Sequence, residues 1–254
     1  MDNIPDPNRS LFWITYGANK KGITLDIETT EGRKIFKKLA STANCIIESF
    51  PVGYLDKLGL GYDDLSRDNS GIILTSITPF GQTGLYRDYK GGDLICASMG
   101  GQVYLCGHED RPPVRIGFPM TYVYAGSEAA AATTIALYYY NKTGEGQHID
   151  VSMQQSVIPT TFNTPVLWAM QQFLVKRAGI SRIGLTSEKR QPVLWKCKDG
   201  WVSFTVMASK AGARSTRALT EWMREEGLCD DDLLNNIDWE TFDIGKTSEE
   251  FQSS

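Results

Sequence analysis

The sequence predicts an α/β fold with a doubly wound, Rossmann-like sheet, because strand-like and helix-like segments alternate along most of the chain. Residues 71–77 form a continuous β-branched, apolar run, which is typical of a parallel strand covered on both faces. Residues 127–140 are rich in alanine and predict a helix that packs closely against its neighbours. A glycine-containing turn at 142–146 then leads into a further strand at 147–151.

The N-terminal elements follow the same alternation. Residues 23–27 alternate between apolar and polar side chains and predict a short strand. The next segment predicts an amphipathic helix with Thr30 as its N-cap. We further expect a buried strand at 45–50 and a helical turn at 54–58 that ends at Gly59.

A change of character near residue 180 predicts a second domain. Residues 179–190 mix arginine and lysine with glycine and serine, and we place the boundary there. Residues 1–180 then form the large-domain portion, and residues 181–254 form the start of a small α+β domain. Within the latter, an Asp-Gly turn at 198–200 between two apolar runs predicts a β-hairpin, and a helix follows at 213–226.

Composition excludes several classes of function. The chain has 254 residues and a net charge of −4, with no basic stripe that would bind nucleic acid. No apolar run reaches the roughly 20 residues that cross a bilayer, and the N-terminal residues lack a secretion signal. We therefore expect a cytoplasmic protein. The five cysteines are scattered without a CxxC pair, so they predict small buried residues rather than disulfides or a metal site.

Five segments, in order, resemble those of the family III coenzyme A transferases. The family includes formyl-, carnitine- and benzylsuccinate-CoA transferases and α-methylacyl-CoA racemase. Each segment alone is a weak signal, whereas the ordered set covers nearly the whole chain and is specific. The resemblance implies the family fold, with CoA or an acyl-CoA as substrate and no metal. The segments are residues 19–26, 48–61, 76–84, 112–115 and 143–152.

The resemblance also implies that parts of the family fold are absent from the sequence. Family members begin with a further strand–helix unit and end with a completed small domain. The chain is thus expected to be either a fragment or a naturally short protein. Since family members form two interlocked, ring-like subunits, a chain without both ends is not expected to close the same ring.

Family transferases use an aspartate carboxylate that attacks the thioester and forms first a mixed anhydride and then an aspartyl-CoA thioester. The family pattern G-x-P-x-A-D-x-x-A-G matches residues 117–126, which places Tyr122 at the nucleophile position, or Thr121 after a one-residue slip. A phenol with a pKa of about 10 is a poor nucleophile at neutral pH. Glu128 is a candidate substitute, six residues further on. No confident catalytic residue is therefore assigned.

Asp93 matches an acidic residue that the family places near its active site, or it caps a turn. The racemase branch needs a histidine directly before this position, where the chain has Gly92. This absence excludes racemisation by that acid–base pair. His108 and His148 lie elsewhere, and we expect His148 to be structural.

The resemblance assigns CoA contacts to Lys20, Ser49, Phe50, Lys57 and Asp93. Serine replaces the family's asparagine in the turn after the 45–50 strand, and a proline two residues later replaces its arginine. Both changes are expected to lower the affinity of this turn for the nucleotide part of CoA. Lys57 keeps a positive charge close to the CoA phosphates, or it is a solvated helix charge.

Three functions remain open. In the first, the chain is a non-nucleophilic subunit of a heteromeric CoA-transferase, similar to the aspartate-lacking subunit of the benzylsuccinate branch. Its partner is then an aspartate-bearing paralogous subunit. Succinyl-CoA is a candidate donor and a carboxylic acid the acceptor. Alternatively, it is a homodimeric transferase with an unusual nucleophile. The third reading is a CoA-binding or interaction protein, or a truncated homologue without activity.

Overall fold

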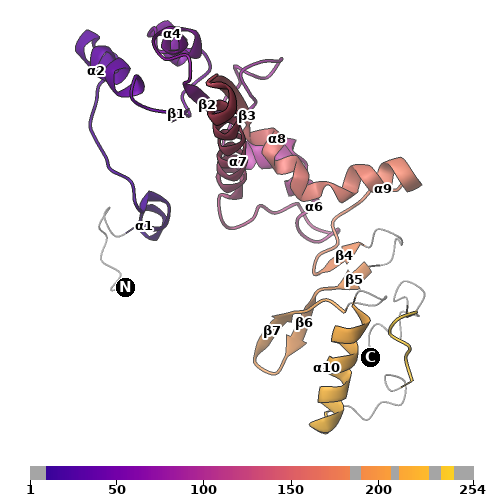
Figure 1. Ribbon diagram of the computed structural model, residues 1–254. Helices are drawn as coiled ribbons and strands as arrows, with labels where there is room; N and C mark the ends of the chain where they lie inside the picture. Colours follow the sequence, from indigo (N-terminus) through magenta and orange to yellow (C-terminus); the bar gives the residue numbers. More distant parts are fainter. Residues whose placement is uncertain (1–9, 184–189, 207–211, 229–235, 243–254) are drawn as a thin grey trace. The chain divides into compact units, whose positions relative to one another are not determined.

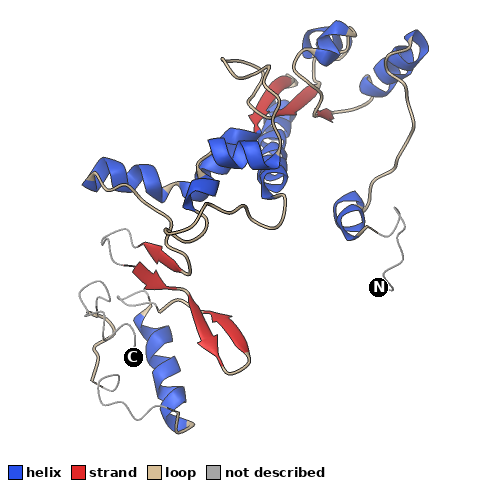
Figure 2. Cartoon of the chain, turned by 180° about the vertical axis from the view of Figure 1, so that it is seen from behind, coloured by secondary structure: helices blue, strands red, loops and turns tan. Residues whose placement is uncertain are grey.

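The computed structural model describes residues 10–183, 190–206, 212–228 and 236–242 (Figure 1). The chain forms two compact units, which are treated separately. The first comprises Met1–Thr75 with Thr133–Ile149, and the second comprises Ser76–Ala132 with Asp150–Ser254. The described elements, whose classes are coloured in Figure 2, are α1 (Leu11–Gly17), α2 (Thr30–Ala40), β1 (Cys45–Glu48), α3 (Tyr54–Lys57), α4 (Tyr62–Asp68), β2 (Ile73–Thr78), α5 (Asp93–Met99), α6 (Gln102–Leu105), α7 (Met120–Thr143), β3 (Gln147–Ser152), α8 (Met153–Val157), η2 (Ile158–Thr161), α9 (Asn163–Gln171), β4 (Ser181–Ile183), β5 (Arg190–Pro192), β6 (Leu194–Cys197), β7 (Gly200–Ser203) and α10 (Ala213–Glu225).

The sheet β1-β2-β3 confirms the predicted α/β class. The N–H of Ile73 donates to the carbonyl of Asn44, and the N–H of Gly146 donates to the carbonyl of Ser70. Each bond joins the start of one strand to the start of its neighbour, so the strands run parallel. β2 is almost wholly buried, as its β-branched sequence predicts. β1 stands at the edge of this order and is only half-buried, so the expected burial of residues 45–50 is wrong.

The prediction of a strand at residues 23–27 is also wrong. Residues 23–26 form a loop that turns at Ile27, no strand among the described residues pairs with them, and Ile23 is 72% exposed. The helix that follows is confirmed as α2, with its N-cap one residue earlier than expected. Thr29 Oγ1 accepts the N–H of Gly32 at 3.0 Å and satisfies one of the unpaired donors of the first turn.

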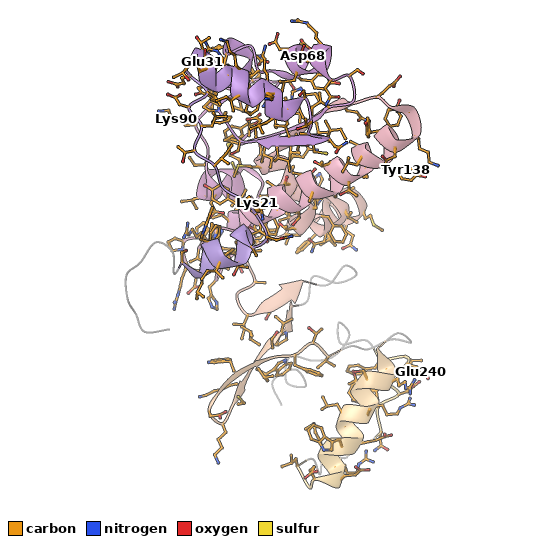
Figure 3. The ribbon with its side chains drawn as sticks, turned by 60° about the vertical axis from the view of Figure 1, so that its left-hand side comes forward. Lys21, Glu31, Asp68, Lys90, Tyr138 and Glu240 are labelled. Atoms are coloured by element: carbon orange, nitrogen blue, oxygen red, sulfur yellow. The ribbon has the colours of Figure 1, made fainter. Side chains whose placement is uncertain are left out.

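The alanine-rich helix α7 begins at Met120, ahead of the expected residue 127. Its buried face repeats every three or four residues and consists of small side chains, which allow close packing of neighbouring elements. Tyr138 projects from the opposite, exposed side (Figure 3) and is 67% exposed. The buried residues are Thr121, Ala125, Ala129, Thr133 and Ala136.

The C-terminal part contains the predicted hairpin. β6 and β7 pair antiparallel, with Leu194 opposite Ser203 and Cys197 opposite Gly200. Helix α10 follows as expected. The predicted domain boundary near residue 180 stays a prediction, and residues 184–189 within it lie outside the described part of the chain.

The cysteines differ in burial. Cys96 is buried, Cys45 and Cys106 are half-buried, and Cys197 is exposed, so the expectation of burial is wrong for Cys197. Burial raises the pKa of the Cys96 thiol. Cys229 lies outside the described residues. No helix in the described ranges combines the length and apolar character that crossing a membrane requires.

Candidate active site

The predicted site residues fall into two groups, one in each compact unit. Asp93 and Tyr122 belong to the second unit, whereas Lys20, the turn that contains Ser49 and Phe50, and Lys57 belong to the first. The two groups are described separately.

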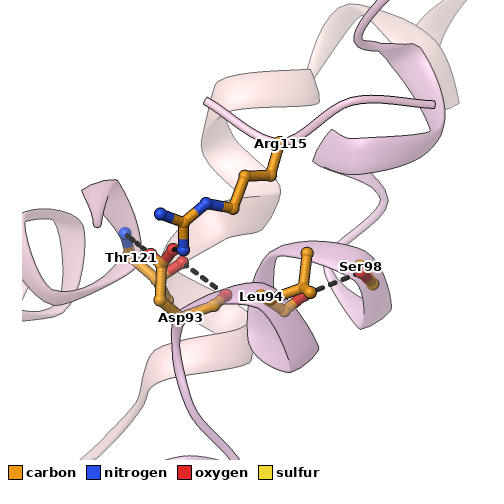
Figure 4. Close-up of polar contacts among 5 residues, drawn as sticks. All are labelled: Asp93, Leu94, Ser98, Arg115 and Thr121. Atoms are coloured by element: carbon orange, nitrogen blue, oxygen red, sulfur yellow. Dashed lines mark hydrogen bonds and ion pairs between the residues drawn. The ribbon is translucent and has the colours of Figure 1, made fainter. Parts of the chain in front are cut away.

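Asp93 connects the start of α5 to the start of α7 (Figure 4). Its Oδ1 atom accepts the N–H of Thr121 at 3.0 Å, and its main-chain oxygen accepts the Thr121 hydroxyl at 3.1 Å. Its Oδ2 atom lies 3.5 Å from Arg115 Nη1, and its side chain is only 13% exposed. Thr121 is the second residue of α7, where helices leave N–H groups unpaired. Asp93 therefore caps α7 from a distant part of the chain.

Tyr122 directly follows the capped residue and is 50% exposed. A Cβ atom placed on Gly92 would lie 3.6 Å from the Tyr122 hydroxyl oxygen. Positions 92 and 122 are thus neighbours in space. They are the two positions to which the family resemblance assigns the histidine and aspartate of the racemase branch, an assignment that stays a prediction; the chain has glycine and tyrosine there. Both oxygens of the nearby Asp93 carboxylate have a partner, since Oδ1 accepts the Thr121 N–H and Oδ2 faces Arg115.

Glu128, the candidate substitute for an aspartate at position 122, lies on a different side of α7 from Tyr122. Six residues of α-helix turn by about 600°, so Glu128 and Tyr122 point to different sides of α7. The Glu128 carboxylate accepts a hydrogen bond from the Ser156 hydroxyl. It lines a separate open pocket of about 550 Å³, together with Phe80, Ser152, Gln154, Gln155, Ile158 and Pro159.

The loop before Asp93 is fixed by contacts with β3 and α8. Asp150 Oδ2 accepts the N–H of Gln82 at 2.8 Å, and the N–H of Gln154 donates to the Pro79 carbonyl at 3.0 Å. Gly91 packs so closely on Pro79 that a Cβ atom would lie 2.4 Å from the proline Cβ. This packing determines where α5 begins and hence where Asp93 lies.

The turn after β1 forms the second group. The N–H of Phe50 donates to Glu48 Oε2 at 2.6 Å, and the Phe50 ring stacks on Tyr54 with 4.8 Å between centroids. The Tyr54 hydroxyl donates to Glu28 Oε1 at 2.9 Å, and this hydrogen bond raises the pKa of Tyr54. The turn is therefore ordered, while the Phe50 ring stays partly exposed.

Ser49 and Lys57 are exposed on this turn and on the last residue of α3. Open α/β sheets bind ligands beyond the carboxyl ends of their strands, which is where this turn lies. Lys20 follows α1, and its Nζ donates to the Tyr16 carbonyl at 2.6 Å. The assignment of CoA contacts to these residues stays a prediction.

The sequence did not reveal the parts played by Thr121 and Arg115. Both contact Asp93, from 28 and 22 residues away in sequence. Arg115 belongs to the family-like segment 112–115, and nothing else in the sequence pointed to it as a site residue.

Comparison with known proteins identifies the family. The model of "CoA-transferase family III" matches residues 2–237. The chain is 34% identical over 248 residues to the succinyl-CoA:(R)-benzylsuccinate CoA-transferase subunit BbsE of Thauera aromatica, which covers 98% of this chain and 58% of that protein. It is 31% identical to the succinyl-CoA–L-malate CoA-transferase beta subunit of Chloroflexus aurantiacus, over 83% of this chain and 52% of that protein.

A solved structure agrees. A CAIB/BAIF family protein from Brucella suis superimposes with a TM-score of 0.67 at 30% identity, over 85% of this chain and 55% of that chain. The chain thus spans about half the length of the curated relatives it matches. With a family match along nearly its whole length, the chain belongs to CoA-transferase family III.

Proposed function

We propose that this chain is the non-nucleophilic subunit of a heteromeric CoA-transferase, which moves CoA between an acyl-CoA and a carboxylic acid. The proposal is supported by Tyr122, which stands where the family resemblance places the nucleophile, and by the neighbouring Asp93 carboxylate, whose two oxygens contact Thr121 and Arg115. The surrounding scaffold keeps its order although the nucleophile is replaced. Two similar proteins are themselves named as subunits, which supports a heteromeric assembly.

We propose succinyl-CoA as the donor, because it appears in the names of several similar proteins. Their names combine it with (R)-benzylsuccinate, D-citramalate and L-malate, all of which are dicarboxylic acids. We therefore infer a dicarboxylic acid as the acceptor for the complex that contains this chain.

In this mechanism, the aspartate of a paralogous partner subunit attacks the thioester carbonyl and releases the CoA thiolate. The thiolate then attacks the aspartyl carbonyl of the mixed anhydride, which releases the first acid and leaves an aspartyl-CoA thioester. The acceptor carboxylate attacks the carbonyl of that thioester, which expels the CoA thiolate and forms a second mixed anhydride. The thiolate then attacks the acceptor carbonyl of this anhydride, which forms the new acyl-CoA and releases the aspartate carboxylate. The present chain contributes binding surfaces: Phe50 and Lys57 for CoA, and Asp93 for the geometry of α7.

The test is co-expression with an aspartate-bearing paralogue, followed by an assay of CoA transfer from succinyl-CoA to a dicarboxylic acid. We expect the chain alone to be inactive and the pair to exceed the paralogue alone by about tenfold or more, since the site gains bound and oriented groups. If the pair transfers CoA no better than the paralogue alone, the proposal is wrong.

Trapping with hydroxylamine separates the alternatives. Under the proposal, mass spectrometry finds the modified carboxyl group only on the partner's aspartate. A modified aspartate or glutamate in the present chain would instead favour the homodimeric transferase. An inactive pair whose present subunit still binds CoA in calorimetry would favour the CoA-binding protein.

A further inference from the structure

Arg115 presents an open hydrogen-bonding edge at the candidate site. Its side chain is 49% exposed, and Nη1 makes a single contact of 3.5 Å with Asp93. Its other N–H donors have no partner within the described ranges. The second terminal nitrogen points away from Asp93 (Figure 4). An arginine has five N–H donors in a rigid fork, so most of this fork is available to a ligand.

Two other arginines of this unit, Arg177 and Arg111, differ in this respect. Arg177 donates through Nε to the His108 carbonyl and through Nη1 to the Tyr104 carbonyl, and it lies over the Tyr104 ring. Its role is structural. Arg111 has a 75% exposed side chain beside its sequence neighbour Asp110. Arg115 combines an anchored guanidinium with an exposed edge.

The anchor is itself held in place. One oxygen of the Asp93 carboxylate accepts the Thr121 N–H and the other faces Arg115, and the aspartate is largely buried. The enclosed space beside this pair measures about 10 Å³, which is room for at most a water molecule. A ligand must therefore approach from the exposed side of the guanidinium. Asp93 orients the fork and leaves that side open.

Arg115 also belongs to the same constellation as the nucleophile position. Its anchor Asp93 contacts Thr121, the residue before Tyr122, and Gly92 lies beside the Tyr122 hydroxyl. A group bound to Arg115 is thus held on the structural unit that the family uses for catalysis.

We propose that Arg115 binds the free carboxylate of a dicarboxylic acid, while the other carboxyl group takes part in CoA exchange. This inference rests on the proposed function, and it adds the residue that selects dicarboxylic over monocarboxylic acids. Two N–H groups of the guanidinium match the two oxygens of a carboxylate. Since Asp93 and Arg115 together carry no net charge, the attraction depends on these direct hydrogen bonds rather than on a long-range field.

Isothermal titration calorimetry of the chain with succinate and with butyrate tests the proposal. These acids have equal carbon number and differ in the second carboxylate. We expect succinate to bind about tenfold more tightly than butyrate, as charged hydrogen bonds of this kind provide. Arg115→Gln removes the charge and the fork, so its preference should disappear. Arg111→Gln is the matched control and should keep the preference, and thermal melting verifies that both variants are folded.

Two results would overturn the inference: equal binding of both acids by the unaltered chain, or an undiminished preference in Arg115→Gln. The outcome is separable from that of the proposed function. If Arg115→Gln loses the preference while the co-expressed pair shows no gain in transfer, the Arg115 site stands and the subunit role falls. If the co-expressed pair gains transfer activity but Arg115→Gln still prefers succinate, the subunit role stands and the Arg115 site falls.

Discussion

The proposed function depends on Tyr122, and Asp93 contacts the residue directly before it. The carboxylate of Asp93 reaches the second N–H of α7 and so sets the helix start one residue before Thr121. The capping of α7 uses the carboxylate of Asp93 and the N–H of Thr121, so it does not depend on which side chain stands at position 122.

Substitution of Asp93 tests this capping at the residue scale. Asp93→Ala leaves the Thr121 N–H without its acceptor and should lower the free energy of unfolding by about 1–2 kcal/mol, the usual cost of losing a helix cap. In Asp93→Asn the side-chain oxygen still accepts the N–H, so about half of that loss or less is expected. Urea denaturation followed by circular dichroism measures both variants. Equal losses in the two variants would show that the Arg115 ion pair, not the cap, is the stabilising contact.

The motif around Tyr122 was readable in the sequence because its residues are consecutive. The contacts that position it were not, because Asp93, Arg115 and Thr121 come from separate segments whose meeting depends on the whole unit. The start of α7 shows the same limit. Its alanine-rich part predicted a helix, but the first turn depends on a cap supplied by a distant aspartate.

At the scale of elements, pairing decided which predicted strands were correct. Residues 71–77 and 147–151 have neighbours in the sheet and contribute β2 and β3, whereas the alternating segment 23–27 has no strand neighbour among the described residues and forms a loop. Alternation records which side chains are apolar, but a strand also needs a partner for its backbone groups. Composition alone cannot supply that partner.

Close backbone packing at the start of β3 gives a prediction for this sheet. A Cβ atom on Gly146 would lie 2.0 Å from the Ile72 carbonyl oxygen. Gly146→Ala should therefore force the strands apart and lower the free energy of unfolding by about 2–3 kcal/mol. Gly22→Ala is the control, because a Cβ atom there meets nothing within 4 Å. It should change stability by less than about 1 kcal/mol. Urea midpoints measure both, and similar midpoints would contradict the packing.

At the scale of the whole molecule, several large apolar side chains are exposed among the described residues. Trp13 of α1, Met170 of α9 and Leu85 are each more than 60% exposed. The chain also spans only about half the length of its curated relatives, two of which are named as subunits. The names of those relatives motivate a test of whether this chain associates with the aspartate-bearing paralogue proposed above.

A subunit that binds only the folded chain must raise its melting temperature. At a free partner concentration of about 100 times Kd, the stabilisation is about 2.7 kcal/mol. For a chain of this size it corresponds to a rise of about 5–10 °C. Differential scanning calorimetry of the chain with and without the aspartate-bearing paralogue measures this rise, and an unrelated protein at equal mass serves as the control. An unchanged melting temperature at saturating paralogue would mean that the two proteins do not associate. The paralogue could then not supply the nucleophilic aspartate to this chain, and the proposed subunit role would be contradicted.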